Sequence, residues 1–91
     1  IDMVGNEPYL LIEKELYEKV TEVMNELPEK CRVVFSMSRI EGFKNQEIAD
    51  RLGLSIKTVE KHISKALDVY RKKFAGYLPL SVVLLVLQGL K

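Results

Sequence analysis

The chain has few of the residues that staple small proteins or hold metal ions. It contains one cysteine, Cys31, and one histidine, His62, among its 91 residues. A single cysteine cannot form an internal disulfide, and these two side chains fall short of the ligand set of a structural zinc site. We therefore expect no disulfide framework, no metal and no cofactor, and the cysteine usage favours a reducing, cytoplasmic location.

The sequence also lacks internal repeats and low-complexity linkers, and no basic segment followed by an apolar one indicates a signal peptide. A chain of this length suits one small domain and is too short for two independent cores. Since 47% of the residues are hydrophobic, a helical core can form without staples. We expect a flexible lead-in over residues 1–7, one domain over 8–75 and an apolar tail over 76–91.

Charge is unevenly distributed, although the net charge is only +1. Residues 1–30 carry eight acidic side chains against three lysines, a balance of −5, whereas residues 39–73 carry nine basic against five acidic side chains, a balance of +4. The densest basic part comprises Lys57, Lys61, Lys65 and Arg71–Lys73. Because a mixed-charge helix face is often only a solvated surface, charge alone leaves the partner open.

Apolar residues recur at intervals of three and four, which predicts an all-α fold. We expect helices over about 8–27, 29–41, 45–52 and from Ser55 to about Phe74. Pro8 suits the first turn of a helix, and Gly42 suits a helix end. Gly53 can adopt positive φ at little cost, and the Ser55 hydroxyl can cap the next helix. These features predict a small helical bundle that contains a helix-turn-helix.

The second expected helix has two apolar sides. Val33, Met37 and Ile40 lie nearly opposite the side that carries Cys31 and Val34. A helix with this pattern is expected to be covered on both sides. Either the first helix covers Val33, Met37 and Ile40, or a partner protein does.

The last helix of the helix-turn-helix has one apolar and one basic side. We expect Leu52 of the preceding helix to point inward, together with the continuous stripe Ile56, Val59, Ile63, Ala66, Leu67, Tyr70 and Phe74. Opposite this stripe lie Lys57, Lys61, Ser64 and Lys65. Lysines four residues apart repel slightly in an isolated helix, so this row does not serve helix stability. It is suited to contact phosphates and base edges.

Residues 27–67, "LPEKCRVVFSMSRIEGFKNQEIADRLGLSIKTVEKHISKAL", resemble region 4 of bacterial sigma factors, in particular the extracytoplasmic-function group. Three segments carry the resemblance: "LPEKCR", "EIADRLGLS" and "TVEKHISKAL". It implies a domain that reads the −35 promoter element in the major groove and docks on the flap of RNA polymerase, with an anti-sigma factor as a second partner. It implies DNA contacts from Lys57, Thr58, Glu60, Lys61, Ser64 and Lys65, and we also expect DNA-backbone contacts from Arg39, Lys44, Asn45, Gln46 and His62.

Two positions need separate comment. Lys44 stands where the family usually has a capping Ser or Thr, although Asn45 can cap the helix one residue later. Glu60 can accept a hydrogen bond from the cytosine amino group but is repelled by phosphate, so its contact would select bases. Alternatively, Glu60 pairs within the helix with Lys57, Lys61 or Ser64.

Other functions remain open on the sequence alone. A response-regulator effector domain has a similar "TVEKHI" helix, but the proline-led helix upstream favours a sigma factor. A protein-interaction module is a second alternative, in which the lysines only keep the protein soluble. An enzyme is the weakest of the three, because His62 has only Glu60 as an acid at workable spacing, and Cys31 on an apolar face is expected to be a small buried hydrophobe.

The tail, "YLPLSVVLLVLQGLK", is nearly continuously apolar. It is too short to cross a membrane, which needs about 20 residues of helix. Pro79 is placed to open a short helix whose one side is lined by Leu80, Val83, Leu84, Leu87 and Leu90. Because Leu85 and its neighbours make the other side apolar too, we expect the tail to pack partly on its own domain and partly on a second copy or an anti-sigma factor. Leu84 and Leu87 are the residues expected at that partner surface, and DNA binding should not require the tail.

Overall fold

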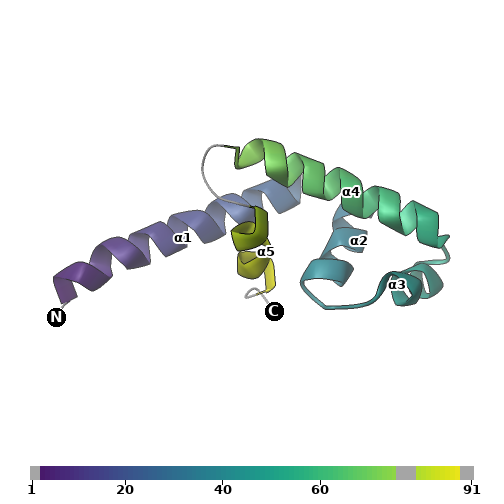
Figure 1. Cartoon of the computed structure of the whole chain (residues 1–91), viewed down its shortest axis with the longest axis horizontal. Helices are drawn as coiled ribbons and strands as arrows, with labels where there is room; N and C mark the ends of the chain where they lie inside the picture. Colours follow the sequence, from purple (N-terminus) through teal and green to yellow (C-terminus); the bar gives the residue numbers. More distant parts are fainter. Residues whose placement is uncertain (1–2, 76–79, 89–91) are drawn as a thin grey trace.

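The structure is a computed structural model that describes the backbone of residues 3–75 and 80–88 and the side chains of residues 14–75 and 82–88. Within these ranges every regular element is a helix, so the all-α prediction is confirmed. Figure 1 shows the arrangement of α1 (Met3–Glu26), α2 (Glu29–Arg39), α3 (Asn45–Leu52), α4 (Ile56–Lys73) and α5 (Leu80–Gln88).

The first helix begins earlier than predicted. Instead of a lead-in over 1–7 and a start at Pro8, α1 is helical from Met3. Proline lacks a backbone N–H, so Pro8 removes the one hydrogen bond to the carbonyl of Val4, and helical backbone continues on both sides of it. The N-terminal part of α1 extends away from the other helices, whereas its C-terminal part lies against them (Figure 1).

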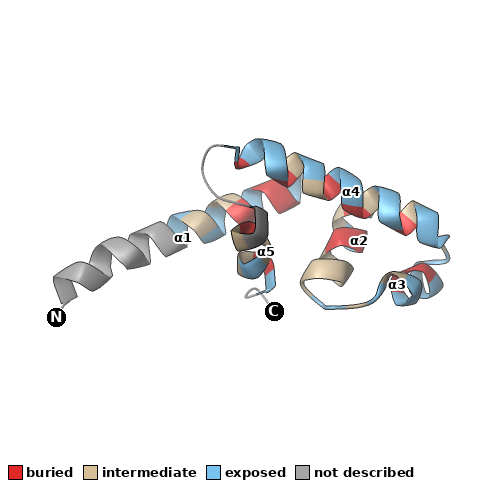
Figure 2. Cartoon of the chain, viewed as in Figure 1, coloured by how far each residue is buried: buried red, intermediate tan, exposed pale blue. Residues whose placement is uncertain are grey.

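One hydrophobic core receives side chains from all the helices (Figure 2). The largest of its fully buried side chains is Tyr70 of α4. The Tyr70 hydroxyl donates a hydrogen bond of 2.9 Å to the carbonyl of Val20 in α1, and its ring lies 5.5 Å from that of Phe35 in α2. Burial raises the pKa of Tyr70. The buried residues are Val20, Val23, Met24, Leu27, Cys31, Val34, Phe35, Ile48, Ala49, Val59, Ile63, Ala66, Tyr70, Phe74, Val83 and Leu87.

The second helix ends two residues before the expected Glu41, and the predicted Gly42 follows in the turn after it. Its last residue is Arg39, and the Glu41 N–H donates to the carbonyl of Ser36 at 3.0 Å. Gly42 then takes a φ of 81°, which is the left-handed conformation that favours glycine. The loop that follows leads directly to the helix-turn-helix.

The C-terminal helix α5 packs on the domain through one side. Val83 and Leu87 are fully buried where α5 approaches α1, α2 and α4, while Leu85 is 66% exposed. The prediction for Leu87 needs correction, because this side chain lies in the chain's own core and not on a surface open to a partner. Its spacing of four residues from Val83 puts both on the same side of the helix. Leu84 is half-buried beside them.

Two apolar residues expected inside lie at the surface. Leu52, the last residue of α3, is 38% exposed, and Ile56, the first residue of α4, is 40% exposed. Both flank the turn at Gly53, between α3 and α4. Helix periodicity gives the direction of a side chain, but it does not say whether another helix reaches far enough to cover it. Within the described ranges, no helix combines the length and the apolar character that crossing a membrane requires.

Candidate nucleic-acid interface

The turn between α3 and α4 requires a glycine for its backbone conformation. Gly53 has φ 67° and ψ 34°, as the sequence predicted, and the next N–H, that of Leu54, donates to the carbonyl of Ala49 at 2.9 Å. A Cβ atom at Gly53 would meet nothing within 4 Å. Glycine is therefore favoured at this position because the turn needs a positive φ, and not because a side chain would clash with its surroundings.

Ser55 caps the first turn of α4, which confirms the prediction. The Thr58 N–H donates to Ser55 Oγ at 3.1 Å, and Ser55 Oγ in turn donates to Thr58 Oγ1 at 2.9 Å. The two hydroxyl groups are therefore hydrogen-bonded to each other, and the Thr58 side chain supports the Ser55 cap at the start of α4. Its expected contact with DNA stays a prediction.

The polar side of α4 is exposed along the first three turns. Lys57, Glu60, Lys61, Ser64 and Lys65 are all exposed and lie opposite the buried stripe, as Figure 2 shows along this helix. The structure therefore brings together these five of the six predicted recognition residues on one surface, which we call the α4 basic row.

Among the described residues, the lysines of the α4 basic row make no ion pair. In the described part of the chain, the ion pairs of α4 belong to its other end, where Asp68 pairs with Arg71 and Lys72, and Lys73 pairs with Glu26. Among the described residues Glu60 also makes no ion pair. The structure therefore does not show the alternative in which Glu60 pairs with Lys57 or Lys61 in the same helix.

The first turn of α4 adds positive character of its own. It contains no acidic residue, and its free N–H groups form the positive end of the helix dipole. Helix N-termini of this kind are favourable places for phosphate groups. The α4 basic row and the positive end of the helix dipole thus both favour the binding of phosphate groups.

The start of α3 differs in detail from expectation. Lys44 occupies the N-cap position, and its backbone N–H donates to Glu47 Oε1 at 2.8 Å. Asn45 is accordingly the first residue of the helix and not its cap. The Gln46 side chain donates to Asp50 Oδ1 at 2.8 Å, and Lys44 is exposed.

Arg39 and His62 are both half-buried. The Nε atom of Arg39 is buried and has no hydrogen-bond acceptor within the described part of the chain.

The carbonyl of His62 accepts a hydrogen bond from the Cys31 thiol at 3.1 Å. Burial raises the pKa of the Cys31 thiol, although nearby Lys65 opposes this, and the side chain is a buried hydrophobe as predicted.

Sequence reasoning missed a contact that holds the loop before α3. The guanidinium of Arg51 lies 4.3 Å from the centre of the Phe43 ring. This cation–π contact ties the loop to the last turn of α3. Phe43 lies in the loop before α3, eight positions from Arg51, so the periodicity of that helix could not have signalled the pair.

A different surface surrounds Val33 on α2, which is exposed. One hollow of about 380 Å³ is lined by Glu29, Lys30, Val33, Leu52 and Leu54, and another of about 340 Å³ is lined by Met24, Arg32, Val33, Ser36, Met37 and Glu41. Of the residues predicted to face a partner here, Met37 and Ile40 are half-buried against the core. On this side, therefore, Val33 is exposed, and Met37 and Ile40 are covered only in part.

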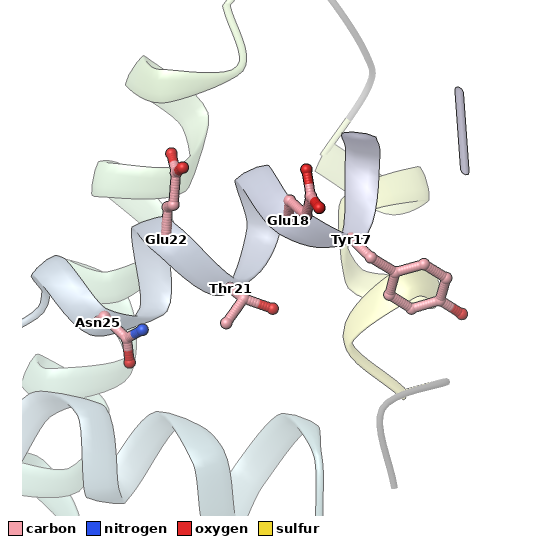
Figure 3. A pocket seen from close by; sticks show the side chains of 5 residues that line it. All are labelled: Tyr17, Glu18, Thr21, Glu22 and Asn25. Carbon is pink, nitrogen blue, oxygen red and sulfur yellow. The ribbon is translucent and has the colours of Figure 1, made fainter. Parts of the chain in front are cut away.

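A third hollow lies along α1 (Figure 3). It has a volume of about 360 Å³ and is lined by Tyr17, Glu18, Thr21, Glu22 and Asn25. Two carboxylates among these residues make it unsuited to phosphate. The described residues also contain no group of acidic, histidine or cysteine side chains that could hold a metal ion.

Residues 17–68 match the protein family described as Sigma-70, region 4. The matched stretch is more than half of the chain. It includes α3, the turn, α4 as far as Asp68 and every predicted DNA-contacting residue, and it ends before α5. Comparison with curated proteins and with solved structures finds no match.

Proposed function

We propose a function from the premise that the chain belongs to the sigma-70 region 4 family. Region 4 is a DNA-binding regulatory domain of sigma factors and not an enzyme, which removes the enzyme alternative. Its partners are promoter DNA and RNA polymerase. The proposal concerns how this chain makes those contacts: α4 enters the major groove of the −35 element, and α2 docks on the polymerase flap.

The observation that carries the DNA contact is the α4 basic row. Three lysines at a spacing of four residues point to one side, exposed and without intramolecular ion pairs among the described residues. An α-helix fits the major groove of B-form DNA, and lysine can bind either phosphate or the acceptor atoms of guanine. Ser64 and Glu60 lie among the lysines and would contact base edges.

Contacts to the DNA backbone are proposed on both sides of α4. Arg39 supports this role because it is only half-buried and its guanidinium carries several N–H donors that suit a phosphate oxygen. Lys44 is exposed at the start of α3, where helix N-terminal N–H groups add positive charge. Asn45, Gln46 and His62 remain in the proposal as secondary contacts.

Docking on polymerase is proposed for the surface around Val33. Val33 is exposed and lines two adjacent hollows, and half-buried Met37 and Ile40 flank it. We propose that the chain belongs to the extracytoplasmic-function group, which residues 27–67 resemble, with an anti-sigma factor as a further partner. The exposed Leu85 side of α5 is the surface we propose for that partner or for self-association.

Salt-dependent binding tests the DNA contact. If Lys57, Lys61 and Lys65 neutralise three phosphates, log affinity should fall against log salt with a slope of roughly −3 from these residues. The triple alanine variant should lose that contribution. The matched control replaces Arg71, Lys72 and Lys73 with alanine, which removes the same charge from the other end of α4 and should leave most of the slope. Equal losses in the two variants would show only a net-charge effect and would contradict the proposal.

A further inference from the structure

We propose that Ile56 reads the 5-methyl group of a thymine in the promoter element. The inference rests on the proposed function, because it assigns a base-reading role to a residue of the same DNA-binding helix. It adds an apolar reader to a surface that otherwise carries charged and polar side chains.

The first support is the position and exposure of Ile56. It is the first residue of α4, directly after the Ser55 cap, and 40% of it is exposed although its spacing belongs to the core stripe. In helix-turn-helix proteins the N-terminal residues of the recognition helix are those that contact base edges. A β-branched side chain in a helix has one strongly preferred χ1 rotamer, so its methyl groups are held in a fixed direction.

The second support is that the polar side chains of the same turn are already engaged. The hydroxyl groups of Ser55 and Thr58 bind each other and cap the helix. Lys57 is a flexible cation that binds phosphate as readily as a base. Discrimination between bases by this turn therefore falls to Ile56, whose apolar complement in the major groove is the thymine methyl group.

The third support is Glu60, which lies four residues further along α4. It is exposed and has no ion pair among the described residues. A carboxylate is repelled by phosphates but accepts a hydrogen bond from the cytosine amino group. Since residues i and i+4 share a helix face, Ile56 and Glu60 mark the side of α4 that suits bases, next to the lysines that suit phosphates.

The experiment uses the full chain and duplex DNA selected by that chain from a random library. Each thymine of the selected site is replaced in turn by deoxyuridine, which lacks only the methyl group. At one position this should weaken binding about fourfold, the change that corresponds to burial of one methyl group at about 0.8 kcal/mol. In the Ile56→Ala variant, the same replacement should have no effect.

Leu52→Ala is the matched control. Leu52 is apolar and 38% exposed, nearly the same as Ile56, but it ends α3 and does not belong to the recognition helix. This variant should keep the full fourfold sensitivity to deoxyuridine. Thermal unfolding of both variants checks that each is folded.

The outcomes separate this inference from the function on which it rests. If a sequence is selected but no thymine position is sensitive, or if the sensitivity persists in Ile56→Ala, the role of Ile56 is overturned and promoter reading stands. If no sequence is selected in the presence or absence of polymerase core, promoter reading is itself overturned, and the role of Ile56 with it.

Discussion

Replacing Leu87 by alanine should destabilise the chain far more than the same change at Leu85. Leu87 is fully buried in the core, whereas Leu85, two residues away in α5, is 66% exposed. Large-to-small changes of buried leucine cost about 2–5 kcal/mol, while surface changes stay within about 0.5 kcal/mol. Because both changes are Leu→Ala in one helix, the difference in helix propensity cancels. For a chain of this size, the Leu87 change should lower Tm by at least about 8 °C.

Urea unfolding followed by circular dichroism measures the difference. Domain stability of about 0.05–0.15 kcal/mol per residue makes a loss of 2–5 kcal/mol a large fraction of the total. The unfolding midpoint of Leu87→Ala should fall strongly, and that of Leu85→Ala should stay close to that of the unchanged chain. Equal midpoints for the two variants would show that α5 does not pack on this domain, and the surface around Leu84 and Leu87 would then be open to a partner.

Three further changes test the domain's internal contacts. Tyr70→Phe should cost about 1 kcal/mol in urea unfolding, since it removes the buried hydrogen bond to Val20. Because burial raises the folded-state pKa of Tyr70 above its unfolded value of about 10, the unfolded state loses this proton first, so stability should fall as pH rises above about 10, and less so in Tyr70→Phe. Gly53→Ala should cost about 1–2 kcal/mol through positive φ alone, and a neutral result in thermal unfolding would refute the strained turn. Ser55→Ala should cost about 1 kcal/mol by removing the cap of α4, which a shift in Tm measures.

Local chemistry made the helix-turn-helix predictable from the sequence. The bounds of α3, the positive φ of Gly53 and the cap at Ser55 each depend on residues within a few positions, and all three agree with the structure. The exposed lysines of α4 follow from the same helical periodicity.

Tertiary contacts decided what the sequence could not predict. The pattern of α5 is apolar on nearly every side, so periodicity could not tell that Leu87 faces the core and Leu85 the solvent. Ile56 fits the apolar stripe of α4, yet 40% of it is exposed, which depends on how the other helices pack and not on its own spacing. The early start of α1 is likewise missed, because the usual meaning of a proline such as Pro8 is a first turn.

The most direct test of the central claim is DNA cleavage from a single position on α4. Ser64→Cys is exposed, while the native Cys31 is fully buried, so an iron chelate can be attached selectively at residue 64. On promoter DNA with polymerase, cleavage from residue 64 should fall within one short stretch at the −35 element. The control, Glu22→Cys on the acidic side of α1, should give no cleavage there (Figure 3). The same cleavage from both positions, or none from residue 64 on DNA that the protein binds, would contradict insertion of α4 into the major groove.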